Sequence, residues 1–205
     1  MDGKPILFSA PMVRALLDGS KTQTRRIVKI PYHAQIEERD DGKMWPWMYH
    51  ADRDDDHWFP CPYGQPGGTL WVREAFRVAE GYKNLSPNGV RALTAGISIH
   101  YEANGAAPPT AGRLRPSIHM PRAWSRIALE ITTVRVERLQ GISDADARAE
   151  GAPPYDEGID EPPPDSDHPW SYCAAYQRLW ESINGPGSWA LNPWVWVVSF
   201  KVVET

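Results

Sequence analysis

The sequence has little of what disulfide-stabilised, membrane-spanning or nucleic-acid-coating proteins need. Its 205 residues include two cysteines, Cys61 and Cys173, which are far apart and lack the spacing of a metal site. No apolar run approaches the roughly 20 residues that cross a bilayer, and the first residues, MDGKPILFSAPMV, lack the apolar stretch of a signal peptide. The net charge of -4 argues against a general nucleic-acid coat protein. We therefore expect a cytoplasmic protein with reduced thiols, no metal, no cofactor and no membrane partner; the oligomeric state stays open.

Proline, glycine and tryptophan are abundant instead. The 20 prolines and 16 glycines predict many ordered loops and little uninterrupted helix. The ten tryptophans are suited to core packing or to stacking on nucleobases. The length fits a single domain over residues 1–205. We expect insertions in that domain at about 31–66, 104–118 and 153–168.

Hydrophobic periodicity predicts an α+β fold with a small curled or barrel-like sheet. Helices are expected over 11–19, 143–151 and 172–185, with Ser143 as an N-cap and Gly19 and Gly151 as left-handed helix ends. Strands are expected over 5–9, 22–30, 69–80, 97–103, 125–139 and 192–204. Residues 31–66 are charged, aromatic and rich in turn formers without a clear period, which predicts an insertion or a long ordered loop.

Several motifs in this order resemble the ASCH domain of the PUA-like superfamily. They are a helix ending in glycine, GSKTQTRR, a PGG-TLWVRE strand, a long strand running into ISDADARAEG, and a terminal WVWVVSF strand. The segments CPYGQPGG, RPSIHMPRAWSRI and LWESINGPGSW resemble longer ASCH proteins that are common in phages and prophages. The resemblance implies a PUA-like small β-barrel with flanking helices and long loop insertions.

The same resemblance implies a function. Small bacterial ASCH members include N4-acetylcytidine amidohydrolases, whose chemistry is assigned to a Lys and a Thr in a G-x-K-T-x-T segment and to a Glu on the helix after the long strand. The resemblance therefore implies that Lys21, Thr24 and Glu150 are the catalytic residues and that the substrate is a small nucleoside. Other ASCH members resemble RNA binders, and at least one type is described as a ribonuclease, so an RNA-binding module without amidohydrolase activity is the alternative.

These three residue types can hydrolyse an amide without a metal. Thr24 could attack directly or position a water, and Lys21 could accept the proton when it is neutral. Because a free lysine titrates near ~10.4, burial or cations such as Arg25 and Arg26 must lower its pKa. Glu150 could orient the lysine or pass a proton to the leaving amine. The alternative is a solvated turn that carries Lys21 and Thr24, and a surface carboxylate at Glu150.

Seven further residues are candidate substrate contacts. Arg25 and Arg26 are adjacent on a strand and so face opposite ways, and one of them could meet a phosphate or pair with Glu74. The remaining candidates are Glu74, Trp71, His119, Arg122 and Trp124, and Trp196 is a further stacking face. Core packing or ion pairing is the alternative for each. In the RNA-binding alternative, the phosphate patch consists of Arg14, Lys21, Arg25, Arg26, Arg122 and Arg126.

Overall fold

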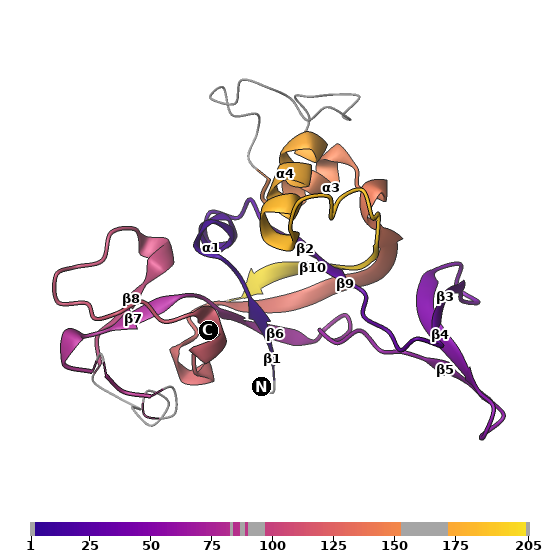
Figure 1. Ribbon diagram of the computed structural model, residues 1–205, viewed down its shortest axis with the longest axis horizontal. Helices are drawn as coiled ribbons and strands as arrows, with labels where there is room; N and C mark the ends of the chain where they lie inside the picture. Colours follow the sequence, from indigo (N-terminus) through magenta and orange to yellow (C-terminus); the bar gives the residue numbers. More distant parts are fainter. Residues whose placement is uncertain (1–2, 83, 87–88, 90–96, 153–171, 204–205) are drawn as a thin grey trace. The chain divides into compact units, whose positions relative to one another are not determined.

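The computed structural model of the chain has an α+β fold, as predicted (Figure 1). The predicted insertion at 153–168 lies outside the residues that the structure describes. The described residues are 3–82, 84–86, 89, 97–152 and 172–203.

The chain divides into two compact units. Unit 1 consists of Met1–Gly19, Gly67–Glu130 and Lys201–Thr205, and unit 2 consists of Ser20–Pro66 and Ile131–Phe200.

The largest sheet has the strand order β1-β6-β9-β10-β2. Its strands are β1 (Lys4–Leu7), β6 (Thr69–Arg73), β9 (Ala128–Arg138), β10 (Trp194–Val203) and β2 (Gln23–Ile27). β1 pairs with β6 in parallel, whereas β6 with β9 and β10 with β2 pair antiparallel. The long strands β9 and β10 contribute residues to both units. β10 is almost continuously apolar because both of its faces are buried through much of its length.

In unit 1, the strand predicted over 69–80 is wrong as a single element. The chain leaves β6 at Glu74 and then forms β7 (Phe76–Val78), which pairs with β8 (Ile99–Tyr101) in a separate two-stranded sheet. The Ala75 carbonyl accepts a hydrogen bond from the Glu102 amide, which directs the chain toward β8. The alternating apolar pattern continues across this change of partner, so periodicity alone does not reveal it.

Helix α1 (Ala10–Leu17) of unit 1 has the ends that its sequence predicts. Pro11 lies in the first turn, and Gly19 follows the helix with a φ of 80°. Val13 and Leu16 are buried. This short helix brings the chain directly to the GSKTQTRR segment.

In unit 2, the prediction of a loop over 31–66 is wrong, because three strands form there. β3 (Gln35–Glu38), β4 (Met44–His50) and β5 (Asp55–Trp58) form a three-stranded antiparallel sheet (Figure 1). A proline in the middle strand and densely charged turns hide the period of two. Cross-strand aromatic pairs such as Trp47–Trp58, with ring centroids 6.3 Å apart, support the pairing.

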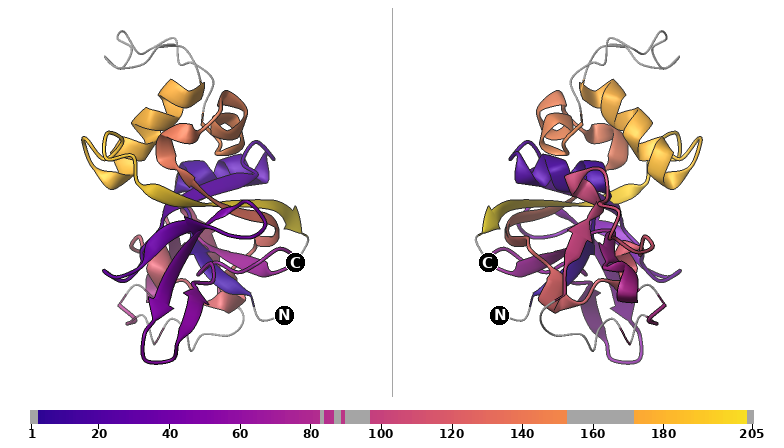
Figure 2. Two further views of the ribbon diagram at one scale, coloured as in Figure 1. Left: turned by 90° about the vertical axis from the view of Figure 1, so that its right-hand side faces the viewer. Right: turned by 90° about the vertical axis from the view of Figure 1, so that its left-hand side faces the viewer.

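Two helices of unit 2, α3 (Asp144–Ala149) and α4 (Tyr172–Asn184), lie side by side in each view (Figures 1 and 2). The Ser143 hydroxyl accepts a hydrogen bond from the Asp146 amide at 3.1 Å, so the predicted N-cap is confirmed. Gly151 has a φ of 76°, as expected for the residue that ends the helix. The apolar core under these helices contains Leu139, Ile142, Ala147, Ala152, Tyr176, Trp180, Val195 and Val197. It holds the C-terminal end of α3 in place.

Candidate functional site

Lys21 and Glu150 meet in unit 2, where the entry to β2 passes the end of α3. Glu150 is the C-cap of α3 and forms an isolated β-bridge with Lys21. Lys21 Nζ donates to Glu150 Oε2 at 3.1 Å, to the Glu150 carbonyl at 2.7 Å and to the Gln23 carbonyl at 2.8 Å. Both side chains are buried, with residue exposures of 1% and 3%. A lysine and a carboxylate from distant segments therefore share one desolvated position.

Burial makes the ammonium form of Lys21 less stable than it is at a protein surface. Burial lowers the pKa of Lys21 below its ordinary value of 10.5, because the charged ammonium loses its hydration. Glu150 acts in the opposite direction, through its charge and its hydrogen bond, while the nearby guanidinium groups of Arg26 and Arg25 add to the lowering. The balance is a lysine that releases its proton more readily than a surface lysine does.

Arg25 fixes the carboxylate that contacts Lys21. Arg25 Nη1 donates to Glu150 Oε1 at 3.3 Å, and Nη2 donates to Asp146 at 3.1 Å and to Glu137 at 3.2 Å. Its side chain is fully buried, so these carboxylates take the place of water around the guanidinium. The two oxygens of Glu150 are thus divided between a lysine and an arginine.

Arg135 extends the network toward the surface. Its guanidinium donates to Asp146 at 3.0 Å, to the Gln23 amide oxygen at 3.1 Å and to Glu137. Burial would raise the pKa of Asp146, but the charges of Arg25 and Arg135 hold it below its ordinary 3.8. The network joins the cations Lys21, Arg25 and Arg135 to the carboxylates of Glu137, Asp146 and Glu150. Its formal charges balance, so it is not built to attract a polyanion.

Thr24, the third predicted catalytic residue, is also buried, with 1% of its surface exposed. It lies opposite Val198 in β10 and alternates along β2 with Gln23 and Arg25, whose side chains both reach Asp146. Successive side chains of a strand point to opposite faces, so Thr24 projects from the other face of β2. The structure thus brings Lys21 and Glu150 into contact and directs Thr24 away from the face that carries the network.

Arg25 and Arg26 face opposite ways, as their adjacency predicts. Arg25 enters the network, whereas Arg26 lies opposite Trp196 in the register of β10 and β2. Trp196 is 2% exposed and packs edge-to-face on Trp45, with ring centroids 4.9 Å apart. Core packing therefore describes Trp196 better than an open stacking face does.

The other predicted contacts belong to unit 1. Glu74 is 2% exposed, and its two oxygens accept hydrogen bonds from Arg126 at 2.8 and 2.9 Å. Glu74 thus pairs with Arg126, which is not among the partners expected for it from the sequence. Arg126 also lies 4.1 Å from the centroid of the Tyr101 ring. This carboxylate is held by a single guanidinium in a bidentate clamp.

Two tryptophans of unit 1 are largely covered. Trp71 and Trp124 are each 7% exposed, and Trp124 packs edge-to-face on Phe76 in an apolar cluster. The guanidinium groups of Arg73 and Arg122 lie 4.8 and 5.6 Å from the centroid of the Trp71 ring. Among these candidates, the exposed Arg122 is the one that a ligand reaches most easily. The remaining candidate, His119, is half-buried in a short 3₁₀ turn over Ser117–His119.

Sequence reasoning missed Asp146, Glu137 and Arg135. A signal for two of them exists, because Arg135 and Glu137 are two residues apart on β9 and alternate with Val134 and Val136. Residues at this spacing share one face of a strand, so the sequence could have predicted an ion pair between Arg135 and Glu137. Their meeting with Arg25 depends on a strand pairing that the sequence does not specify.

Other chemistry has less support in the described part of the chain. Burial raises the pKa of the Cys173 thiol to about 12, which makes it a poor nucleophile. No group of three or more His, Cys, Asp and Glu side chains among the described residues is arranged to hold a metal ion. None of the described helices is both long and apolar enough to cross a membrane.

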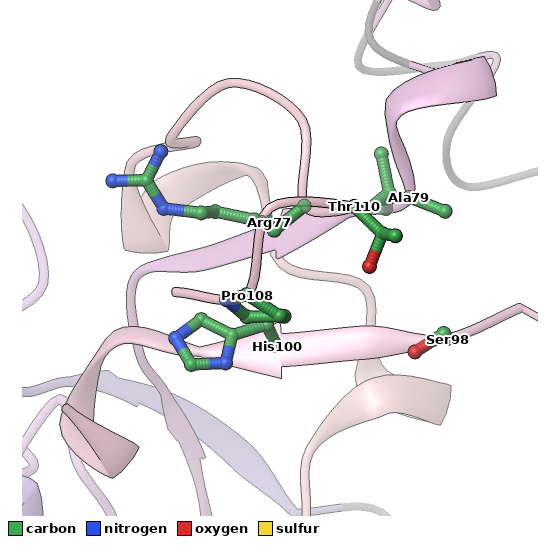
Figure 3. Close-up of a pocket in the computed structure, with 8 residues that line it drawn as sticks. Arg77, Ala79, Ser98, His100, Pro108 and Thr110 are labelled. Atoms are coloured by element: carbon green, nitrogen blue, oxygen red, sulfur yellow. The ribbon is translucent and has the colours of Figure 1, made fainter. Parts of the chain in front are cut away.

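A small hollow lies in unit 1, beside the β7–β8 hairpin (Figure 3). None of the site residues predicted from the sequence lines it. Its lining consists of Arg77, Val78, Ala79, Ser98, His100, Pro108, Thr110 and Ala111. Comparisons of the chain with protein-family models, curated proteins and solved structures found no match.

Proposed function

We propose that this protein is an amidohydrolase of the ASCH type that removes the acyl group from N4-acylated cytidine or a related nucleoside. The observation that carries the proposal is the buried contact of Lys21 Nζ with Glu150 Oε2 at 3.1 Å, between residues 129 positions apart. Both residues follow from the ASCH resemblance of two separate segments. A PUA-like barrel, formed by closure of the curled sheet, is the finer part of the same proposal.

The proposed reaction replaces the amide C–N bond with a C–O bond. Lys21, in its neutral form, accepts a proton from a water, and the water oxygen attacks the acyl carbon. The proton passes to the exocyclic nitrogen of cytosine as that amine leaves, with Glu150 orienting Lys21 or relaying the proton. Hydrolysis yields a carboxylic acid and cytidine. The lowered pKa of Lys21 supports this role, because a lysine base must be neutral.

The decisive experiment follows product release from N4-acylcytidines, N4-acyldeoxycytidines and acylated RNA. We expect the wild type to release cytidine from at least one of them. Lys21→Met and Glu150→Gln should each lose about 10²- to 10⁴-fold in rate, the contribution of one proton-transfer group. Thr24→Val should change the rate little, because Thr24 lies on the other face of β2. These substitutions keep the approximate volume at buried positions.

The matched control is Glu130→Gln, which removes a partly exposed carboxylate in an ion pair with Lys201. It should hydrolyse at the wild-type rate. The unfolding midpoint of every variant is measured alongside, so that loss of fold is separated from loss of chemistry. Turnover that persists in a folded Lys21→Met protein would contradict the role of Lys21.

The second candidate function is RNA binding without hydrolysis. The observation that favours it is the set of guanidinium groups on aromatic rings in unit 1, with Arg73 and Arg122 on Trp71 and Arg126 on Tyr101. Lys21 and Arg25 cannot belong to the predicted phosphate-binding patch, because their side chains are fully buried. A salt titration separates the two functions, since RNA affinity falls steeply with salt when phosphate contacts release counterions.

A further inference from the structure

The sheet β3-β4-β5 of unit 2 has one face that carries four aromatic rings. Directly paired residues of antiparallel strands point to the same face, and Trp47 is paired with Trp58. Trp45 and Tyr49 lie two residues before and after Trp47 on β4, so they share this face. We call Trp45, Trp47, Tyr49 and Trp58 the aromatic face.

The two ends of the aromatic face differ in exposure. Trp45 packs edge-to-face on the buried Trp196 and donates from Nε1 to the Phe59 carbonyl at 2.8 Å, so it anchors the sheet. At the other end, Tyr49 is 49% exposed, and Trp47 and Trp58 are half-buried. The contacts of Trp45 hold this end of the sheet in place. The rings at the other end keep part of their surface accessible to a ligand.

The rings of this face already accept a cation. The guanidinium of Arg39 lies 5.3 Å from the centroid of the Trp45 ring and 5.8 Å from that of Trp58. Such a contact is electrostatically favourable, and more so where water is excluded. A second guanidinium, from another molecule, could make the same kind of cation–π contact with Trp47 and Tyr49.

The surroundings of the aromatic face are strongly acidic. Between residues 35 and 58 there are eight carboxylates against three cations, Arg39, Lys43 and Arg53, which is a formal net charge of -5. All eight side chains are exposed: Glu37, Glu38, Asp40, Asp41, Asp52, Asp54, Asp55 and Asp56. A nucleic-acid strand would be repelled here, whereas a cationic chain would be attracted and oriented.

We propose that the aromatic face binds an extended arginine- and lysine-rich segment of a partner protein. The carboxylates attract the segment to the sheet, and its guanidinium or ammonium groups then lie on the outer rings of Trp47 and Tyr49. The aromatic face shares no residue with the Lys21–Glu150 site, so each proposal can be tested without the other.

The alternation of the sheet supplies a matched pair of variants. Glu37 is paired with Trp45 and Asp56 with Tyr49, so both carboxylates lie on the aromatic face. Glu38 is paired with Met44 and Asp55 with His50, so these two lie on the opposite face. Glu37→Gln/Asp56→Asn and Glu38→Gln/Asp55→Asn therefore remove the same charge from the same two strands, β3 and β5, but from different faces.

The test is fluorescence anisotropy with a labelled oligo-arginine peptide, and with a single-stranded RNA and an oligo-glutamate peptide as comparison probes. We expect oligo-arginine alone to bind, and the Glu37→Gln/Asp56→Asn variant to bind about tenfold more weakly. The Glu38→Gln/Asp55→Asn control should retain most of the affinity. Tyr49→Leu, which keeps an apolar side chain but removes the ring, should lose about threefold.

Three results would overturn the proposal. Equal losses in the two double variants would mean that the peptide senses overall charge and not the aromatic face. Wild-type affinity in both would place the peptide elsewhere on the chain. Binding of RNA in preference to oligo-arginine would identify the opposite class of partner. Circular dichroism and unfolding midpoints establish that each variant is folded.

Discussion

Two buried carboxylates in this protein, Glu150 in unit 2 and Glu74 in unit 1, have different partners. They are 3% and 2% exposed. Glu74 presents both oxygens to one arginine, Arg126, at 2.8 and 2.9 Å. Glu150 divides its oxygens between Lys21 and Arg25. The burial is alike, but the partners are not.

The difference decides what each pair can do. An arginine keeps its proton at every pH relevant to a folded protein, so the Glu74–Arg126 clamp is a structural pair. A buried lysine gives up its proton more easily, and the pKa of Lys21 is lowered by its burial. Of these two pairs, only the one with the lysine offers a base.

The largest expected effect is on turnover. Lys21→Met should reduce N4-acylcytidine hydrolysis about 10²-fold or more, whereas Arg126→Met should leave the rate per folded molecule unchanged. Steady-state kinetics, corrected for the folded fraction, measures both. Equal losses of turnover in the two variants would contradict the assignment of Lys21 as a base and of Arg126 as a structural residue.

A large effect on stability is expected at the clamp. Arg126→Met leaves Glu74 buried without its cation, which should lower the free energy of unfolding by about 3 kcal/mol. The double variant Glu74→Gln/Arg126→Met should recover part of this loss, since no charge is then buried. Urea denaturation measures both values. A single variant as stable as the wild type would show that water can solvate Glu74.

The pH dependence of stability sharpens the comparison further. Because the folded-state pKa of Lys21 lies below 10.5, the unfolded chain holds the proton longer as the pH rises. The free energy of unfolding should therefore rise with pH between the folded-state pKa and 10.5, and fall again as the pH is lowered through that folded-state pKa.

Lys21→Met should remove this rise. The comparison with the variant is needed because burial also raises the pKa values of Cys173 and Tyr176, which lowers the stability of both proteins at alkaline pH. Urea unfolding at a series of pH values gives the difference. Parallel curves for wild type and variant would mean that Lys21 titrates normally.

The smallest effect is expected at the start of α3, which carries Glu150. Ser143→Ala removes the hydroxyl that accepts the Asp146 amide and should cost about 1 kcal/mol of stability. The reaction rate per folded molecule should change little, because the core under α3 still holds its C-terminal end. Thermal unfolding and kinetics on the same samples test this. A rate loss as large as that of Lys21→Met would show that the cap itself positions Glu150.

Local chemistry made much of the fold predictable. Ser143, Pro11 and Gly19 mark helix ends because hydroxyl caps, a fixed φ and a positive φ act within a few residues. The β3-β4-β5 sheet was missed because Pro46 and the acidic turns obscured its alternation. The end of β6 at Glu74 was missed because strand partners are chosen by distant segments.

The amino-acid sequence by itself determined the helix ends and most strands of the five-stranded sheet, since propensity and capping act over short distances. Lys21, Thr24 and Glu150 became candidates through the resemblance of two motifs to the ASCH domain. Only the tertiary structure decided that Lys21 and Glu150 touch, that Arg25 holds the same carboxylate and that Thr24 projects from the other face of β2. Contact, burial and a shifted pKa arise where segments far apart in the chain exclude water together.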